Sequence, residues 1–223
     1  MPNLLVAGNS TNGGTAISTD TSGTLNIVTG SGSGANAITI DASQAVTMPG
    51  NLTVTGTLTA TGGVSGGIRS GTAVASTSGT SIDFTSLPTG LRRITVMFNG
   101  VSTNGSSIVQ IQIGSGSVST SGYKSTSSFG VSANQFASAT SGFITDTAFA
   151  SSALTRAGIY VLTLLSSNTW VGSGNMGGDG TAQVTFSCAG NSPALAGALD
   201  RVRITTVNGT DTFDAGSINI LYE

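Results

Sequence analysis

The stretch GNLTVTGTLTATGGVSGG, residues 50–67, alternates apolar and polar residues and carries no charge. Threonine fills nearly every polar position, while leucine, valine and alanine fill the apolar ones. Because successive side chains of a β-strand point to opposite faces, this pattern predicts short strands with one apolar face. That face must be buried, and the neighbouring sequence offers few large side chains that could cover it.

The whole region 1–67 shares this character, because it contains no lysine, no arginine and no aromatic residue. Such a segment cannot form a core alone and usually needs disulfides, metals or oligomerisation. Cys188 is the only cysteine and histidine is absent, so an intrachain disulfide and a His- or Cys-based metal site are excluded. We therefore expect self-association into an intertwined β shaft. The side chains expected to line its axis are Leu52, Val54 and Leu58, and the apolar pairs expected to form strands are Leu25/Ile27, Ile38/Ile40, Val46/Met48, Leu52/Val54 and Leu58/Ala60.

The composition predicts an all-β protein with few charges. Only 7% of the residues are charged, against about 25% in typical domains. With 38% hydrophobic residues and a mean hydropathy of +0.25, this favours packed structure over disorder. The net charge of −2 and the lack of a basic patch argue against nucleic-acid binding. The start MPNLLVAGNS lacks the features of a signal peptide, and no apolar run is long enough to cross a membrane, so we expect cytoplasmic synthesis without membrane insertion.

A second region, residues 68–223, follows the glycine-rich stretch GGVSGG at 62–67, which reads as a linker. It contains every basic and every aromatic residue of the chain. Its strand patterns and intervening turn signals predict a β-sandwich or jelly-roll head, with one helical turn possible at ALAGAL. The expected strands cover residues 81–87, 91–101, 107–116, 142–150, 157–166, 182–190, 200–209 and 217–223.

Catalysis has little support in the sequence, because the absence of histidine removes Ser–His and Cys–His arrangements. Asp200, Asp211 and Asp214 could act as paired carboxylates in glycoside hydrolysis, but DTFDAG is also a turn sequence in which aspartates cap the backbone. Asn175 and Asp179, in an expected loop GNMGGDG, are too few to hold calcium alone. We expect no enzyme activity, no metal and no cofactor.

Three residues are candidates for receptor binding. Tyr123 and Lys124 lie in SGYKSTSS and Trp170 lies in SSNTWVGSG, and both segments are expected to be exposed loops. Aromatic rings in such loops can stack on sugars or anchor protein contacts. The alternative is that both rings cover the edge of the core or an interface between subunits. Cys188, within an expected strand, is predicted to be a small buried apolar residue.

The segment GNLTVTGTLTATGG is similar to the shafts of tailed-bacteriophage fibre proteins. LRRITVMFNGVSTNGSSIVQIQIGSG (residues 91–116) and LDRVRITTVNGTDTFDAGSINILYE (residues 199–223) resemble a C-terminal domain of phage tail-fibre-like proteins. The resemblance spans about residues 45–223. It implies a homotrimeric virion fibre made in the bacterial cytoplasm, held by its N-terminal region to other virion proteins. Its head would contact a bacterial surface glycan or protein.

Three alternatives remain open on the sequence. The short shaft favours a capsid-bound head fibre or a short tail fibre over a long tail fibre. A capsid decoration or cement protein would instead lay its N-terminal region along the shell. A polysaccharide depolymerase would require two carboxylates in one groove.

Overall fold

The chain is all-β in a computed structural model that describes residues 25–28, 36–40, 43–49, 53–55, 67–129, 135–147, 151–180 and 183–223, and no helix occurs in these ranges. Accordingly, none of these residues belongs to a helix long and apolar enough to cross a membrane. The contacts divide the chain into two compact units, Met1–Thr61 and Gly62–Glu223. This division falls at the start of the GGVSGG stretch, whereas the sequence places the boundary at its end.

The N-terminal unit contains a small antiparallel sheet formed by β1 (Leu25–Val28), β2 (Asn36–Ile40) and β3 (Val46–Thr47). These strands coincide with the first three apolar pairs of the sequence, and their pairing is within one chain. Val46 is 56% exposed and Val54 is 42% exposed. Leu52 and Leu58, the other residues expected at a trimer axis, lie outside the described residues. The apolar side chains that the structure does describe near the end of this unit are therefore uncovered in the single chain.

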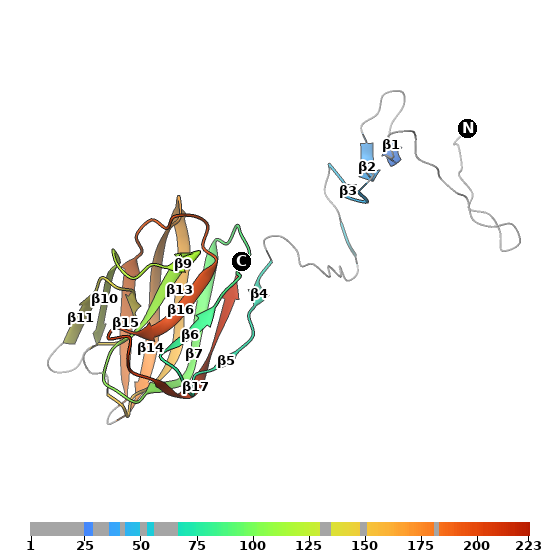
Figure 1. Ribbon diagram of the computed structural model, residues 1–223. Coiled ribbons are helices and arrows are strands. Elements are labelled where there is room, and N and C mark those ends of the chain that lie inside the picture. Colours follow the sequence, from blue (N-terminus) through green and yellow to red (C-terminus); the bar gives the residue numbers. More distant parts are fainter. Residues whose placement is uncertain are drawn as a thin grey trace, which may run out of the picture. The chain divides into compact units, whose positions relative to one another are not determined.

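The C-terminal unit consists of two antiparallel sheets (Figure 1). The larger sheet has the order β11-β10-β15-β14-β13-β7-β17-β4, with β5 also paired to β17. Its strands are β4 (Arg69–Ser70), β5 (Val74–Ala75), β7 (Arg93–Thr103), β10 (Lys124–Phe129), β11 (Gln135–Ala139), β13 (Thr155–Ser166), β14 (Thr169–Asp179), β15 (Val184–Asn191) and β17 (Phe213–Tyr222). The smaller sheet has the order β12-β8-β16-β6, with β9 paired to β8. Its strands are β6 (Ser81–Phe84), β8 (Val109–Ser115), β9 (Ser117–Val118), β12 (Phe143–Ile144) and β16 (Arg201–Thr206).

Both sheets contribute alternate side chains to one hydrophobic core. On β7 the buried residues are Ile94, Val96 and Phe98, spaced two apart as the pleat requires. Aromatic rings connect the two sheets, because Phe143 of β12 packs edge-on against Tyr123, with ring centroids 5.2 Å apart, and also contacts Tyr160 of β13. This unit therefore has the complete core that the N-terminal unit lacks.

All eight strands expected in the C-terminal region are present, although β12 occupies only two residues of the expected strand at 142–150. Two expected loops are strands instead. SGYKSTSS contains β10, and most of SSNTWVGSGNMGGDG forms β14, so the prediction of a flexible loop at 174–180 is wrong. The segment ALAGAL contains no helical turn.

Strand β14 tolerates its glycines because a large neighbouring side chain takes the space that their side chains would fill. Gly172 and Gly174 lie beside Tyr160, and a Cβ atom on either glycine would come within 2.5–2.8 Å of the Tyr160 ring. The glycine-rich sequence is therefore a packing requirement of the core in this strand.

Candidate functional site

A groove of about 500 Å³ lies at the edge of the larger sheet. We call it the hydroxyl groove, because most of its lining side chains end in a hydroxyl group. It lies where β10 begins and β11 ends, since these two strands pair with each other. Its lining consists of Tyr123, Lys124, Ser125, Thr126, Ser138, Ala139, Thr140, Ser141 and Val207.

Tyr123 is part of the fixed wall of this groove. Its hydroxyl accepts a hydrogen bond from the Ile113 backbone N–H at 2.9 Å and donates to the Ser119 carbonyl oxygen at 3.1 Å. Burial raises the pKa of this phenol to about 12, so it stays protonated and able to donate. The side chain is only 1% exposed. The expectation that Tyr123 projects from an exposed loop is therefore wrong, because the ring is held in the core between the sheets.

Lys124 is the charged residue of the groove. Its side chain is exposed, and it has no carboxylate within ion-pair distance among the described residues. By contrast, Arg93, Arg156, Arg201 and Arg203 each form an ion pair among the described residues. The Lys124 ammonium therefore gives this otherwise neutral groove a positive charge.

The serine and threonine hydroxyls of the groove fall into two groups, those that bond within the protein and those that do not. Ser125 Oγ accepts from the Ile144 N–H at 2.9 Å, and Ser141 Oγ donates to Gln110 Oε1 at 2.7 Å, so both help to fix the wall. The hydroxyls of Thr126, Ser138 and Thr140 make no hydrogen bond within the described part of the chain. Three hydroxyls and one ammonium are thus available to a ligand rich in hydroxyl or carboxylate oxygens.

Trp170, the third predicted receptor residue, does not reach this groove. It belongs to β14, and its side chain is 1% exposed. Its backbone N–H donates to Ser192 Oγ at 3.0 Å, and its carbonyl oxygen accepts from the Ser192 N–H at 2.8 Å. The expectation of an exposed Trp170 is also wrong, because the GSGN sequence after it continues a strand.

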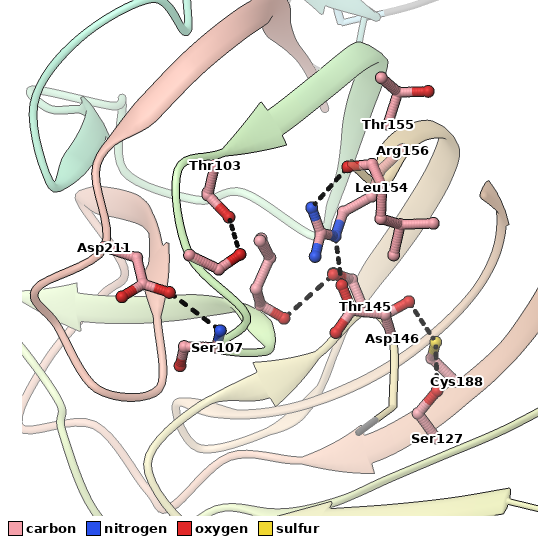
Figure 2. Close-up of polar contacts among 12 residues, drawn as sticks. Thr103, Ser107, Ser127, Thr145, Asp146, Leu154, Thr155, Arg156, Cys188 and Asp211 are labelled. Carbon is pink, nitrogen blue, oxygen red and sulfur yellow. Dashed lines mark hydrogen bonds and ion pairs between the residues drawn. The ribbon is translucent and has the colours of Figure 1, made fainter. Parts of the chain in front are cut away.

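A buried ion pair between Asp146 and Arg156 was not predicted from the sequence. Both side chains are fully buried, and Figure 2 shows the guanidinium lying between the Asp146 carboxylate and the Leu154 carbonyl oxygen. Burial raises the pKa of Asp146 to about 6, although the neighbouring Arg156 charge and hydrogen bond act in the opposite direction. Neither residue lines the hydroxyl groove, so we assign the pair to the core. The one available signal was a charged residue inside an apolar strand pattern, as in GFITDTAFA.

Cys188 lies close to this pair, and its predicted burial is confirmed. Its thiol donates to the Thr145 carbonyl oxygen at 3.1 Å and lies 3.3 Å from Ser127 Oγ (Figure 2). Burial raises the pKa of the thiol to about 11, so the reactive thiolate is scarce at neutral pH.

The three candidate catalytic carboxylates are each engaged in local structure. Asp200 binds the Arg201 guanidinium, and this hydrogen bond lowers the pKa of Asp200. Asp211 accepts from the Ser107 N–H at 2.9 Å (Figure 2) and from Asn208 Nδ2 at 2.6 Å. Asp214 accepts from the Ser102 hydroxyl. Asp211 thus has the turn role of the alternative interpretation, whereas Asp214 lies in strand β17 and Asp200 is paired with a neighbouring arginine. None of the three residues lines the hydroxyl groove.

Asn175 and Asp179, which the sequence offers as too few ligands for calcium, lie on strand β14. Asn175 Oδ1 accepts from the Ser187 hydroxyl at 3.1 Å on the neighbouring strand. Among the described residues, no group of three or more His, Cys, Asp or Glu side chains is arranged to hold a metal ion.

The chain was compared with family models, with curated proteins and with solved structures, and none of them matched. Its function is therefore inferred from its own residues and their geometry.

Proposed function

We propose that this chain is a structural fibre protein of a tailed bacteriophage. Residues 1–67 would attach to the virion and form a short intertwined shaft, and residues 68–223 would form a jelly-roll head that contacts the bacterial surface. The resemblance of residues 50–63, 91–116 and 199–223 to phage fibre segments motivates the proposal. The observation that carries it is the contrast between the two units, one with exposed apolar strands and one with a closed core.

The N-terminal unit supports self-association or attachment. Val46, Met48 and Val54 are exposed large apolar side chains in the single chain. Burying apolar surface stabilises an assembly by about 25 cal/mol per Å², so a repeated contact along a shaft would give a useful gain. A homotrimer in which three copies cover these residues is the proposed arrangement.

The head supports recognition of a glycan through the hydroxyl groove. The unpaired hydroxyls of Thr126, Ser138 and Thr140 suit the hydroxyl groups of a sugar, and Lys124 favours sugars that carry a carboxylate or phosphate. One such groove would bind weakly. Three copies on one fibre would multiply the affinity through effective concentration.

Electron microscopy tests the proposal. Antibodies against the head are applied to phage particles that carry this chain, and the position of the label on the particle is recorded. Label at the ends of projecting fibres, together with blocked adsorption to bacteria, is the expected result. Label spread over the capsid, with particles that fall apart when the chain is missing, would support a decoration protein instead. Particles without any label would show that the chain is not a virion component.

A further inference from the structure

Phe136 is an exposed aromatic ring on the edge strand of the larger sheet. Its side chain is 71% exposed, whereas the other phenylalanines that the structure describes are at most 7% exposed. It belongs to β11, which stands at one end of the strand order, next to β10 (Figure 1). Single exposed apolar side chains are common on proteins, so what distinguishes Phe136 is its position relative to the hydroxyl groove.

The ring lies on the same face of the sheet as the free hydroxyl groups of that groove. Phe136, Ser138 and Thr140 alternate along the chain, and all three are exposed, whereas the residues between them are less exposed. The neighbouring strand β10 is in register with this row, because Thr126 pairs with Ser138 and Ser128 pairs with Phe136. Phe136 is therefore the next side chain beyond Ser138 on the face that carries the groove hydroxyls.

Lys124 lies at the other end of this row. It comes two residues before Thr126 on β10, so its exposed side chain belongs to the same face. From Lys124 to Ser128, the residue opposite Phe136, the strand covers about 13 Å, which is about the length of two or three linked pyranose rings. The row thus has a cation at one end, an aromatic ring at the other, and hydroxyl groups between them.

These three kinds of group together match an acidic oligosaccharide. The face of an aromatic ring is electron-rich and attracts the polarised C–H groups on the apolar side of a pyranose ring. Serine and threonine hydroxyls donate and accept hydrogen bonds, as the hydroxyl groups of sugars do. The Lys124 ammonium, which has no carboxylate within ion-pair distance among the described residues, complements an acid group. A neutral sugar would leave this charge unused, and a single sugar acid would not reach from Lys124 to Phe136.

We propose that Phe136 extends the hydroxyl groove into a site for an acidic oligosaccharide of two or three sugar units. The ring stacks on the unit at one end, and Lys124 binds the acid group of the unit at the other end. The hydroxyls of Thr126 and Ser138 hydrogen-bond to the sugar between them. This inference rests on the proposed glycan recognition by the groove, and it adds the residue that sets the length of the ligand.

The test is a titration with ligands of increasing length. The full-length protein is titrated with galacturonic acid oligomers of one to four units and with neutral maltotriose, and the backbone amide NMR signals of Thr126 and Ser138 report binding. We expect the affinity to increase about tenfold from one unit to three, equivalent to about 1.4 kcal/mol, and to change little at four. Maltotriose should bind more weakly than the acidic trimer, because it lacks the acid group for Lys124.

Four variants assign the two ends of the site. Phe136→Ala should weaken binding of the trimer about tenfold and leave binding of the single unit unchanged, whereas Phe136→Tyr, which keeps a ring, should bind as the natural chain does. Lys124→Gln should weaken binding of every acidic oligomer. The matched control is Leu165→Ala, which removes a side chain that is 66% exposed on the more distant strand β13. It should leave every affinity unchanged.

The outcomes separate this inference from the function on which it rests. Equal affinities for one and three units, or a Phe136→Ala variant that binds the trimer as the natural chain does, would overturn the role of Phe136 but leave the groove as a sugar site. Groove signals that move with none of the oligomers would overturn both. A Phe136→Ala variant with a lower mass in light scattering and unchanged affinities would assign the ring to a contact between copies of the chain, and would also overturn the inference.

Discussion

At the scale of single residues, the buried ion pair between Asp146 and Arg156 is the most unusual use of charge in the chain. Asp146 and Arg156 are both fully buried, yet one carboxylate oxygen and one guanidinium nitrogen have no hydrogen-bond partner among the described residues. Removing two ions from water costs more than an incompletely satisfied pair regains. The pair is therefore weak as a source of stability, but the Arg156 charge is needed as long as the buried Asp146 carboxylate is ionised.

Breaking this pair should be far more damaging than removing it. Arg156→Met leaves the Asp146 carboxylate buried without a counter-ion and should lower the free energy of unfolding at pH 8 by about 3–5 kcal/mol. The double variant Asp146→Asn with Arg156→Met should recover most of that loss. Urea denaturation measures both.

The matched control is Arg203→Met, which breaks the partly exposed ion pair with Asp83. It should cost less than about 1 kcal/mol. Equal costs for Arg156→Met and Arg203→Met would contradict the argument from burial.

The pH dependence of stability should carry the signature of Asp146. Because burial raises the pKa of this carboxyl from 3.8 to about 6, the folded state binds the proton more tightly than the unfolded chain does. The contribution is fully present below the unfolded pKa, falls as the pH rises towards about 6, and is constant above that. Urea denaturation across this range should show the decline in the natural chain and not in the Asp146→Asn, Arg156→Met double variant. A contribution that instead rises with pH would mean that Arg156 lowers the pKa more than burial raises it.

Cys188 should resist thiol reagents in the folded protein. The thiol is buried and its pKa is raised to about 11, so both access and thiolate formation are restricted. Labelling with a chromogenic disulfide reagent at neutral pH should proceed only as fast as the chain unfolds, and should be complete at once in urea. Immediate labelling without denaturant would show that the strand β15 opens locally.

At the scale of the secondary-structure elements, the sequence predicts the strands that carry β-branched residues in alternation. RITVMF and VQIQI are examples, and both form core strands. The strands β10 and β14 escape prediction because serine and glycine, read locally, indicate turns. Only the tertiary structure provides the Tyr160 ring that makes Gly172 and Gly174 suitable for a strand.

The candidate sites are likewise predicted from the local sequence only in part. Residue type and spacing identify Tyr123, Lys124 and Trp170 as notable, and the structure places the first two beside one groove and the third beside another pocket. The sequence leaves open whether Tyr123 and Trp170 are exposed or buried. The burial of Tyr123 depends on Phe143 and Ile113, which come from other strands. The partnership of Asp146 with Arg156 likewise depends on long-range packing.

The glycines of β14 provide a test at this scale. Gly174→Ala should destabilise the protein by about 1–3 kcal/mol, because the new methyl group would lie 2.6 Å from the Ile159 carbonyl oxygen and 2.8 Å from Tyr160. Gly177→Ala in the same strand is the matched control. Its Cβ atom would meet nothing closer than 3.5 Å, so we expect a change below about 1 kcal/mol. Thermal denaturation of both variants makes the comparison, and similar losses would refute the packing explanation.

At the scale of the whole molecule, the two units differ in what they need from other chains. The unit Gly62–Glu223 has its own core, whereas the described part of Met1–Thr61 exposes Val46, Met48 and Val54. The sequence predicts this contrast, since every aromatic residue lies after position 67.

Light scattering should give the intact chain a mass near three times 21.9 kDa. A fragment comprising residues 68–223 should be a monomer that unfolds cooperatively, because it retains the core. A monomeric intact chain would contradict the proposed trimer. It would instead favour attachment of the N-terminal strands to a different protein. A trimeric fragment would place the interface in the head instead.

The order of strands in the larger sheet also constrains how the molecule is made. The last strand, β17, pairs with β7 on one side and with β4 and β5 on the other. The strands β4, β5 and β7 therefore cannot complete their pairing until residues 213–222 have left the ribosome. Such long-range pairing slows folding and leaves an open edge during synthesis. A chain released before residue 213 is added would keep an unpaired edge on β7 and a strong tendency to aggregate.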